Sequence, residues 1–282
     1  MHKQPGQETK IIPQPPRLLI LLLAGLLISW LPARSTTAAP SDPPLTDRAA
    51  KVLAKVGPQL ERELAAKDLR FGAPVFLRIF KMPGELEVWL EDTGRYRLFK
   101  SYSICSLSGF PGPKTREGDW QSPEGFYTVT AQQMNPQSSY HLSFDIGYPN
   151  EYDRFFNRSG GNIMVHGSCS SMGCFAMTDY RVEEIYTLVH AALTGGQEAT
   201  PVHVFPFPLT AANMDKFRTS PWFAFWSNLK QGYDLFEKTG LVPEVQVADG
   251  RYLVTGRDLA GRARPAAGER YSLALSPEKS SR

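Results

Sequence analysis

The chain has 282 residues, of which 42% are hydrophobic and 21% charged, and its formal net charge is +3. This composition is typical of a soluble globular protein and excludes a disordered chain, and so small a charge excludes the strongly basic surface of a nucleic-acid-binding protein. The length suits one main domain with smaller appendages rather than two full domains.

The first 39 residues have the order of a secretory signal peptide. Lys3, Lys10 and Arg17 precede a 14-residue apolar run, 18–31, and small residues follow. This run is shorter than the roughly 20 residues that a helix needs to cross a hydrocarbon core. We therefore expect export to the periplasm without a lasting membrane span, and an uncleaved anchor is the alternative. No single cleavage position stands out.

Residues 40–70 are predicted to form a proline-rich linker and an N-terminal helical segment. Apolar residues recur at helical spacing over 46–69, and Pro58 interrupts them. Because proline lacks the backbone N–H that a helix interior needs, we expect two short helices or one kinked helix, with a stop near Gly72.

Residues 71–208 are predicted to form the main, largely β domain. β-branched and aromatic residues, separated by turn residues, predict a series of strands. The expected strands are 75–80, 86–90, 96–104, 125–130, 163–165 and 202–207. One helix is expected over 180–193, with Asp179 as its cap and Gly195 and Gly196 at its end.

Residues 209–257 are predicted to be a C-terminal helical and strand extension. Aromatic residues crowd the helical stretch 210–238, and we interpret them as core and lid packing rather than as a cofactor site. Residues 258–282 are a polar tail for which loose order is expected.

The segment 165–177 carries the chemistry. His166 and Cys174 lie eight residues apart, and Gly167 and Gly173 adjoin them. An imidazole can accept the thiol proton, and a glycine before the nucleophile lets backbone amides approach an oxyanion. The pattern predicts a cysteine nucleophile with a histidine base.

A metal site is not expected. The chain has only three cysteines and five histidines, and it lacks CxxC and HExxH spacings. Cys169, Cys174 and His166 together lack an evident fourth ligand. We expect neither a metal nor another cofactor.

These motifs resemble the signature of L,D-transpeptidases, the YkuD-like family. The His-Gly and Ser-x-Gly-Cys elements of residues 166–174 carry the resemblance, together with Ser-Pro-Glu-Gly-Phe-Tyr at 122–127. Gly-Pro-Lys at 112–114 and Gly-Cys-Phe-Ala-Met at 173–177 make the YafK branch most similar, over about residues 74–253. The resemblance implies a mainly β fold, a curved mixed sheet or sandwich with one helix after the cysteine loop and appended helices.

The same resemblance implies roles for individual residues. Cys174 corresponds to the nucleophile and His166 to the base, with the Gly167 carbonyl orienting the imidazole. The amides of Gly173 and Cys174 correspond to the oxyanion hole. The implied substrate is a peptidoglycan stem peptide that contains meso-diaminopimelate.

Further substrate contacts are predicted around this motif. Lys114 and Arg116 belong to a loop expected beside the nucleophile, where either side chain can bind a carboxylate. The Ser171 hydroxyl has a site role or a turn role. Tyr140, Asp145 and Arg154 are expected to border the groove.

Two positions depart from the family pattern, and they leave alternatives open. Met172 stands where many relatives have histidine, and Ala176 stands where they have arginine. The interpretation we favour is hydrolysis of protein–peptidoglycan links, which releases a wall-anchored lipoprotein. The alternatives are a transpeptidase that forms cross-links or attaches lipoprotein, and an inactive peptidoglycan-binding module. A papain-like protease is disfavoured because its cysteine precedes its histidine by a long interval.

The other two cysteines are expected to form a disulfide. In an oxidising periplasm Cys105, at the end of an expected strand, can pair with Cys169 and leave Cys174 free. The alternative, Cys169 with Cys174 as a redox brake, would strain a tight loop.

Overall fold

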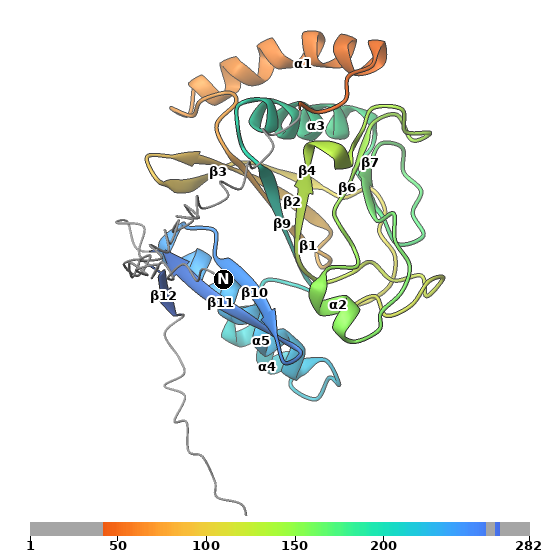
Figure 1. Cartoon of the computed structure of the whole chain (residues 1–282), viewed down its shortest axis with the longest axis vertical. Coiled ribbons are helices and arrows are strands. Elements are labelled where there is room, and N and C mark those ends of the chain that lie inside the picture. The colour runs from red at the N-terminus through yellow and green to blue at the C-terminus, as the bar shows by residue number, and fades with distance from the viewer. Residues whose placement is uncertain (1–41, 258–262, 266–282) are drawn as a thin grey trace, which may run out of the picture. The chain divides into compact units, whose positions relative to one another are not determined.

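The computed structural model describes residues 42–257 and 263–265 (Figure 1). The expected signal peptide and most of the expected tail lie outside these residues. The described residues belong to one unit. None of the helices in this part of the chain is long and apolar enough to span a membrane.

A five-stranded mixed sheet has the order β3-β2-β1-β9-β4. Its strands are β1 (Val75–Phe80), β2 (Glu85–Asp92), β3 (Arg95–Ser103), β4 (Gly125–Thr130) and β9 (Ala199–Phe205). The central pair β1 and β9 is parallel, and the other pairs are antiparallel. These strands confirm the five strands expected in this part of the sequence.

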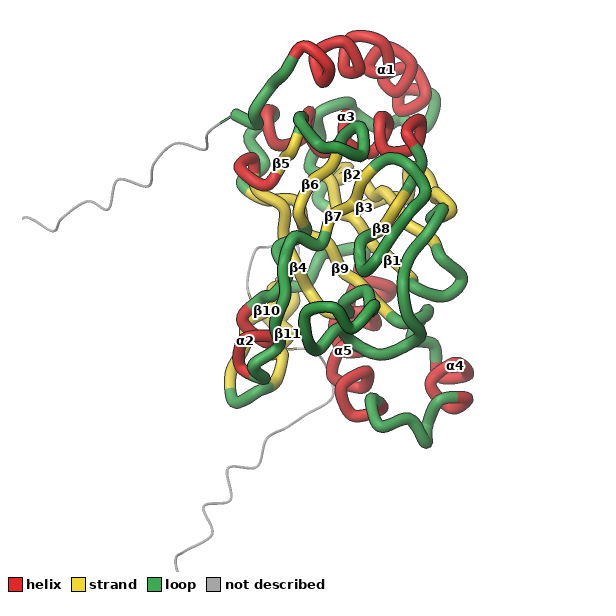
Figure 2. Tube along the Cα trace, turned by 90° about the vertical axis from the view of Figure 1, so that its right-hand side faces the viewer, coloured by secondary structure: helices red, strands yellow, loops and turns green. Residues whose placement is uncertain are grey.

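Both faces of this sheet are covered. All six residues of β1 are buried, and alternate side chains enter different cores. Leu77 and Ile79 join the core shared with α3 (Asp179–Thr194), and Phe80 joins the core shared with α5 (Phe223–Thr239). Figure 2 shows α3 and α5 on opposite sides of the sheet.

A second, four-stranded sheet carries the cysteine motif. Its order is β5 (Met134–Asn135), β6 (Ser143–Asp145), β7 (Met164–His166) and β8 (Phe175–Ala176). Only β7 was expected, from the apolar run at 163–165; β5, β6 and β8 were missed, because two or three residues are too few to show an alternation pattern. The short elements η1 (Ala131–Gln133) and α2 (Glu151–Phe155) flank this sheet.

The N-terminal helix α1 (Asp47–Ala65) is continuous, although Pro58 lies inside it. Of the two alternatives expected here, two short helices is therefore wrong, and the chain forms one helix. One buried face, formed by Val52, Val56, Leu60 and Leu64, packs towards α3, which α1 contacts. A proline inside a helix costs about 3 kcal/mol, and burial of four such side chains, each worth roughly 1.5–3 kcal/mol, outweighs that cost.

The C-terminal region forms α4 (Ala211–Lys216), α5 and a small sheet of β10 (Glu244–Ala248), β11 (Arg251–Arg257) and β12 (Ala263–Pro265). Its aromatic side chains form a second core with residues of β1, β4 and β9. β12 falls within the expected tail, so that expectation is wrong at 263–265, where the chain pairs with β11.

Candidate active site

Cys174 is a free thiol at the edge of the second sheet. Its Sγ lies 3.4 Å from the backbone nitrogen of Met164, which donates to it, and 3.5 Å from the carbonyl oxygen of Asn162, which can accept its proton. Burial raises the pKa of this thiol above its ordinary value, so the resting form is protonated.

His166 is held by its neighbour in the chain. Its Nδ1 lies 2.6 Å from the carbonyl oxygen of Gly167, and the side chain is buried. A carbonyl only accepts, so Nδ1 carries the proton and Nε2 keeps its lone pair. Burial lowers the pKa of His166, despite the Gly167 carbonyl, and the resting imidazole is neutral. The ring of Tyr140 lies over it, with centroids 4.8 Å apart.

Strand register brings the thiol and the imidazole to one face of the sheet. β7 and β8 are parallel, with Val165 opposite Phe175 and His166 opposite Ala176. Side chains alternate along each strand, so His166 and the residue before Phe175, Cys174, point to the same side. This arrangement can supply a nucleophile and a neutral base to one bound carbonyl group.

The turn before the nucleophile is braced by Ser171. Its hydroxyl donates to the Cys174 carbonyl oxygen at 2.6 Å and accepts from the Gly173 amide at 3.1 Å. The φ angle of Gly173 is 134°, which favours glycine. The Gly173 amide is thus occupied in this state, so its expected oxyanion role requires that it leave Ser171.

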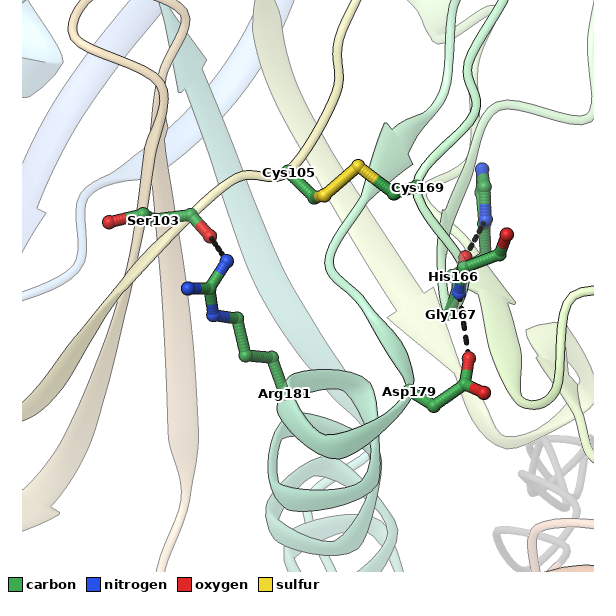
Figure 3. Close-up of a disulfide and its surroundings, with 8 residues drawn as sticks. Ser103, Cys105, His166, Gly167, Cys169, Asp179 and Arg181 are labelled. Carbon is green, nitrogen blue, oxygen red and sulfur yellow. Dashed lines mark hydrogen bonds between the residues drawn. A yellow bond between two sulfur atoms is a disulfide. The ribbon is translucent and has the colours of Figure 1, made fainter.

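A disulfide and a carboxylate fix the turn that follows His166 (Figure 3). Cys105 and Cys169 are bonded, with their Cα atoms 5.4 Å apart. Asp179 was expected to cap α3, but Thr178 holds the cap position. The Asp179 carboxylate instead accepts from the Ser168 amide at 2.7 Å. A Cβ on Gly167 would lie 2.6 Å from Asp179 Oδ1, so this turn requires glycine.

The loop before β4 contains the two expected carboxylate-binding residues. The Lys114 side chain is buried, and its Nζ donates to Asp119 Oδ1 at 2.7 Å and to the Arg116 carbonyl oxygen at 2.9 Å. Lys114 therefore has intramolecular partners, while the Arg116 side chain is exposed. Contact of either residue with substrate stays a prediction.

A buried ion pair, which the sequence did not indicate, supports the same loop. Lys81 Nζ lies 3.0 Å from Glu124 Oε1 and also donates to the carbonyl oxygens of Gly112 and Ser122. Glu124 accepts from the Gly112 amide at 2.6 Å and from Trp226 Nε1 at 2.8 Å. Through Trp226, helix α5 of the C-terminal region is bonded to the loop that borders the site.

Asp145, which the sequence analysis expected at the groove, and Met164, which it did not name, lie on the two strands beside the thiol. Asp145 and Met164 are antiparallel partners on β6 and β7, next to Cys174. Strand register places both residues in line with Cys174, and no motif marks Met164. Among the described residues, no three His, Cys, Asp or Glu side chains form a group that could hold a metal ion.

Comparison with known proteins places the chain in a family. The model of the L,D-transpeptidase catalytic domain (YkuD) matches residues 84–204. The protein described as "Putative L,D-transpeptidase YafK" in Escherichia coli K12 is 44% identical over 189 residues, which are 67% of this chain and 77% of that protein. The chain belongs to the L,D-transpeptidase (YkuD) family, as the motifs at residues 122–127 and 166–174 predicted.

Two solved structures are also similar to this chain. The helical cell shape determining protein Pgp2 of Campylobacter jejuni aligns with a TM-score of 0.39 and 16% identity, over 77% of this chain and 98% of that one. Bd1075 of Bdellovibrio bacteriovorus aligns with a TM-score of 0.38 and 16% identity, over 65% of this chain and 80% of that one.

Proposed function

We propose that this protein is an exported, periplasmic cysteine acyl-transfer enzyme that hydrolyses links between diaminopimelate-containing stem peptides and a wall-anchored lipoprotein. The observation that carries the proposal is the Cys174 thiol on the same sheet face as His166, whose Nδ1 is committed to the Gly167 carbonyl. This arrangement leaves Nε2 as the base for the thiol proton.

The first half of the reaction forms a thioester. The thiol proton moves to His166 Nε2 as Cys174 Sγ attacks the carbonyl carbon at the L-centre of diaminopimelate. The carbon–nitrogen bond then breaks, and the leaving amine takes the proton from His166. Since burial raises the pKa of Cys174 and lowers that of His166, the resting pair is neutral, and the proton moves together with the attack.

The second half consumes water. His166 takes a proton from water while the water oxygen bonds to the thioester carbon, and the carbon–sulfur bond breaks. The sulfur regains the proton from His166. Support for water as the acceptor comes from Ala176, which is fully buried and has no charge where many family members have arginine. Its backbone is bonded to Ser106.

The test uses intact sacculi that carry covalently attached lipoprotein. Wild-type enzyme should release the protein and leave a free carboxyl group on diaminopimelate, as measured by mass spectrometry. Cys174→Ala should abolish release, and His166→Ala should slow it by about 10²- to 10⁴-fold. Both variants must keep the wild-type unfolding transition.

The other outcomes separate the alternatives. New diaminopimelate–diaminopimelate bridges, or attachment of protein without release, would identify a transpeptidase. If the protein binds sacculi but forms neither a released nor a cross-linked product, and if Cys174 does not react with iodoacetamide, the protein is a binding module.

A further inference from the structure

The face of the second sheet that bears the thiol carries a row of three chemically different side chains. Asp145 pairs with Met164 across β6 and β7. Met164 and Cys174 each precede one member of the pair Val165 and Phe175 on the parallel strands β7 and β8, so they lie side by side. The hydrogen bond from the Met164 amide to Cys174 Sγ agrees with this. The row runs carboxylate, thioether, thiol.

Asp145 lacks a cationic partner among the described residues. It is half-buried, and its Oδ1 accepts from the Gly147 amide at 2.8 Å. Burial raises the pKa of Asp145, and no positive group counters this shift. The positive charge of Lys114 lowers the pKa of Cys174, but the Lys114 ammonium donates a hydrogen bond to Asp119 and not to Asp145.

The carboxylate acts on the nucleophile electrostatically. The negative charge of Asp145 contributes to the raised pKa of Cys174, and Lys114 opposes it. A half-buried charge that disfavours the thiolate would be neutralised by a bound cation. A substrate with a positive group at this point would therefore satisfy Asp145 and favour ionisation of Cys174.

We propose that Asp145 selects substrates whose diaminopimelate carries a free ammonium group at its D-centre, with Met164 as the apolar floor beneath the three methylene groups. The inference rests on the proposed function, because it assumes that the L-centre carbonyl meets Cys174. Beyond that function, Asp145 recognises the D-centre ammonium group of the substrate.

The dimensions of the row suit this ligand. Neighbouring strands lie about 4.8 Å apart, so Asp145 and Cys174 are separated by about 10 Å. Six single bonds of about 1.5 Å link the L-centre carbonyl carbon to the D-centre nitrogen, and they span about 7 Å when extended. Approach distances of about 3 Å at each end bring the total to about 13 Å, so the methylene chain fits the row of about 10 Å in a bent rather than a fully extended conformation. Met164 is flexible and polarisable, which suits contact with a methylene chain.

A chemical consequence follows for the cell wall. When the D-centre amine is acylated in a cross-link, it loses its charge and cannot pair with Asp145. The enzyme therefore acts on stem peptides whose D-centre amine is free. It discriminates against stem peptides whose D-centre amine is acylated in a cross-link.

The test compares two synthetic stem peptides that differ only by acetylation of the D-centre amine. Wild-type enzyme should cleave the peptide with the free D-centre amine with a kcat/KM about 10- to 100-fold higher than that for the acetylated peptide. This is the range expected for a hydrogen bond between charged groups. In Asp145→Asn the ratio of the two kcat/KM values should fall to within about threefold. Only the kcat/KM for the free-amine peptide should decrease. Asparagine keeps an oxygen acceptor for the Gly147 amide, so the local turn is preserved.

Controls separate recognition from structure. Asp92→Asn removes a carboxylate that pairs with Arg97, outside this sheet, and should leave the preference unchanged. The pH profile of Cys174 alkylation in Asp145→Asn should shift to lower pH, because a negative charge has been removed. The comparison of the two peptides on wild-type enzyme needs no variant and stands even if Asp145→Asn fails to fold.

The outcomes for the two proposals differ. Equal cleavage of both peptides by wild-type enzyme would overturn the role of Asp145 and leave the proposed function intact. Cleavage of neither peptide, with sacculi also unchanged, would overturn the proposed function. If Asp145→Asn slows both peptides equally, the residue is structural and the inference is wrong.

Discussion

Replacement of His203 by phenylalanine should remove much of the acid sensitivity of the fold. His203 lies in β9, 3% exposed, with its ring centroid 4.6 Å from that of Phe76 and 4.7 Å from that of Phe126. Burial and the charge of Arg78 lower the pKa of His203 to about 3. In the unfolded chain the pKa of histidine is about 6.5, so between these values the unfolded state binds more protons and stability falls as pH falls.

The magnitude follows from this difference. At pH 5 the unfolded histidine is almost fully protonated and the folded one is not, which corresponds to a loss of about 2 kcal/mol relative to pH 7.5. Urea unfolding at both pH values measures it, and other titrating groups cancel when His203→Phe is compared with wild type. His203→Gln is a second variant, which keeps polarity without titration in this range. Equal losses between pH 7.5 and 5 in wild type and both variants would refute the reasoning.

Three further perturbations test the framework around the site. Lys81→Met leaves Glu124 buried without its partner and should lower the free energy of unfolding by about 3–5 kcal/mol in urea titrations; a loss below about 1 kcal/mol would contradict the role of this pair. Reduction of the Cys105–Cys169 disulfide, which closes a sequence separation of 64, should cost about 4 kcal/mol in the chain-entropy model. The check is calorimetry with and without reductant, and unchanged melting would be evidence against the bond. Thr178→Gly should stabilise the fold by about 1 kcal/mol, because Thr178 has φ 69° and a buried hydroxyl without a partner in the described part of the chain; a destabilised variant would show that this backbone geometry is not strained.

The sequence was sufficient where the signal is local. Alternation and turn residues located β1 to β4 and β9, and the spacing of His166, Gly173 and Cys174 indicated the chemistry and the family. Glycine beside a nucleophile is also a local requirement, which a few consecutive residues display. The two-residue strands β5 and β8 were missed, because a pattern needs more positions to be recognised.

Local patterns misled where long-range contacts prevail. Pro58 normally interrupts a helix, yet α1 continues, because its apolar face packs against a helix more than a hundred residues later in the chain. Asp179 has the sequence of a cap, yet its carboxylate is bonded to Ser168, eleven residues earlier. Lys114 was expected to be able to bind a substrate carboxylate, and the fold pairs its buried ammonium with the carboxylate of Asp119.

The amino-acid sequence by itself determined the order of the principal strands, the nucleophile motif and the family. Only the tertiary structure decided which distant side chains share a face with Cys174. Asp145 lies 29 positions from it; the sequence analysis expected Asp145 at the groove, but its alignment with Met164 and Cys174 comes from the strand register alone. They meet because β6, β7 and β8 align in one sheet, and register is a property of paired strands that no single segment encodes.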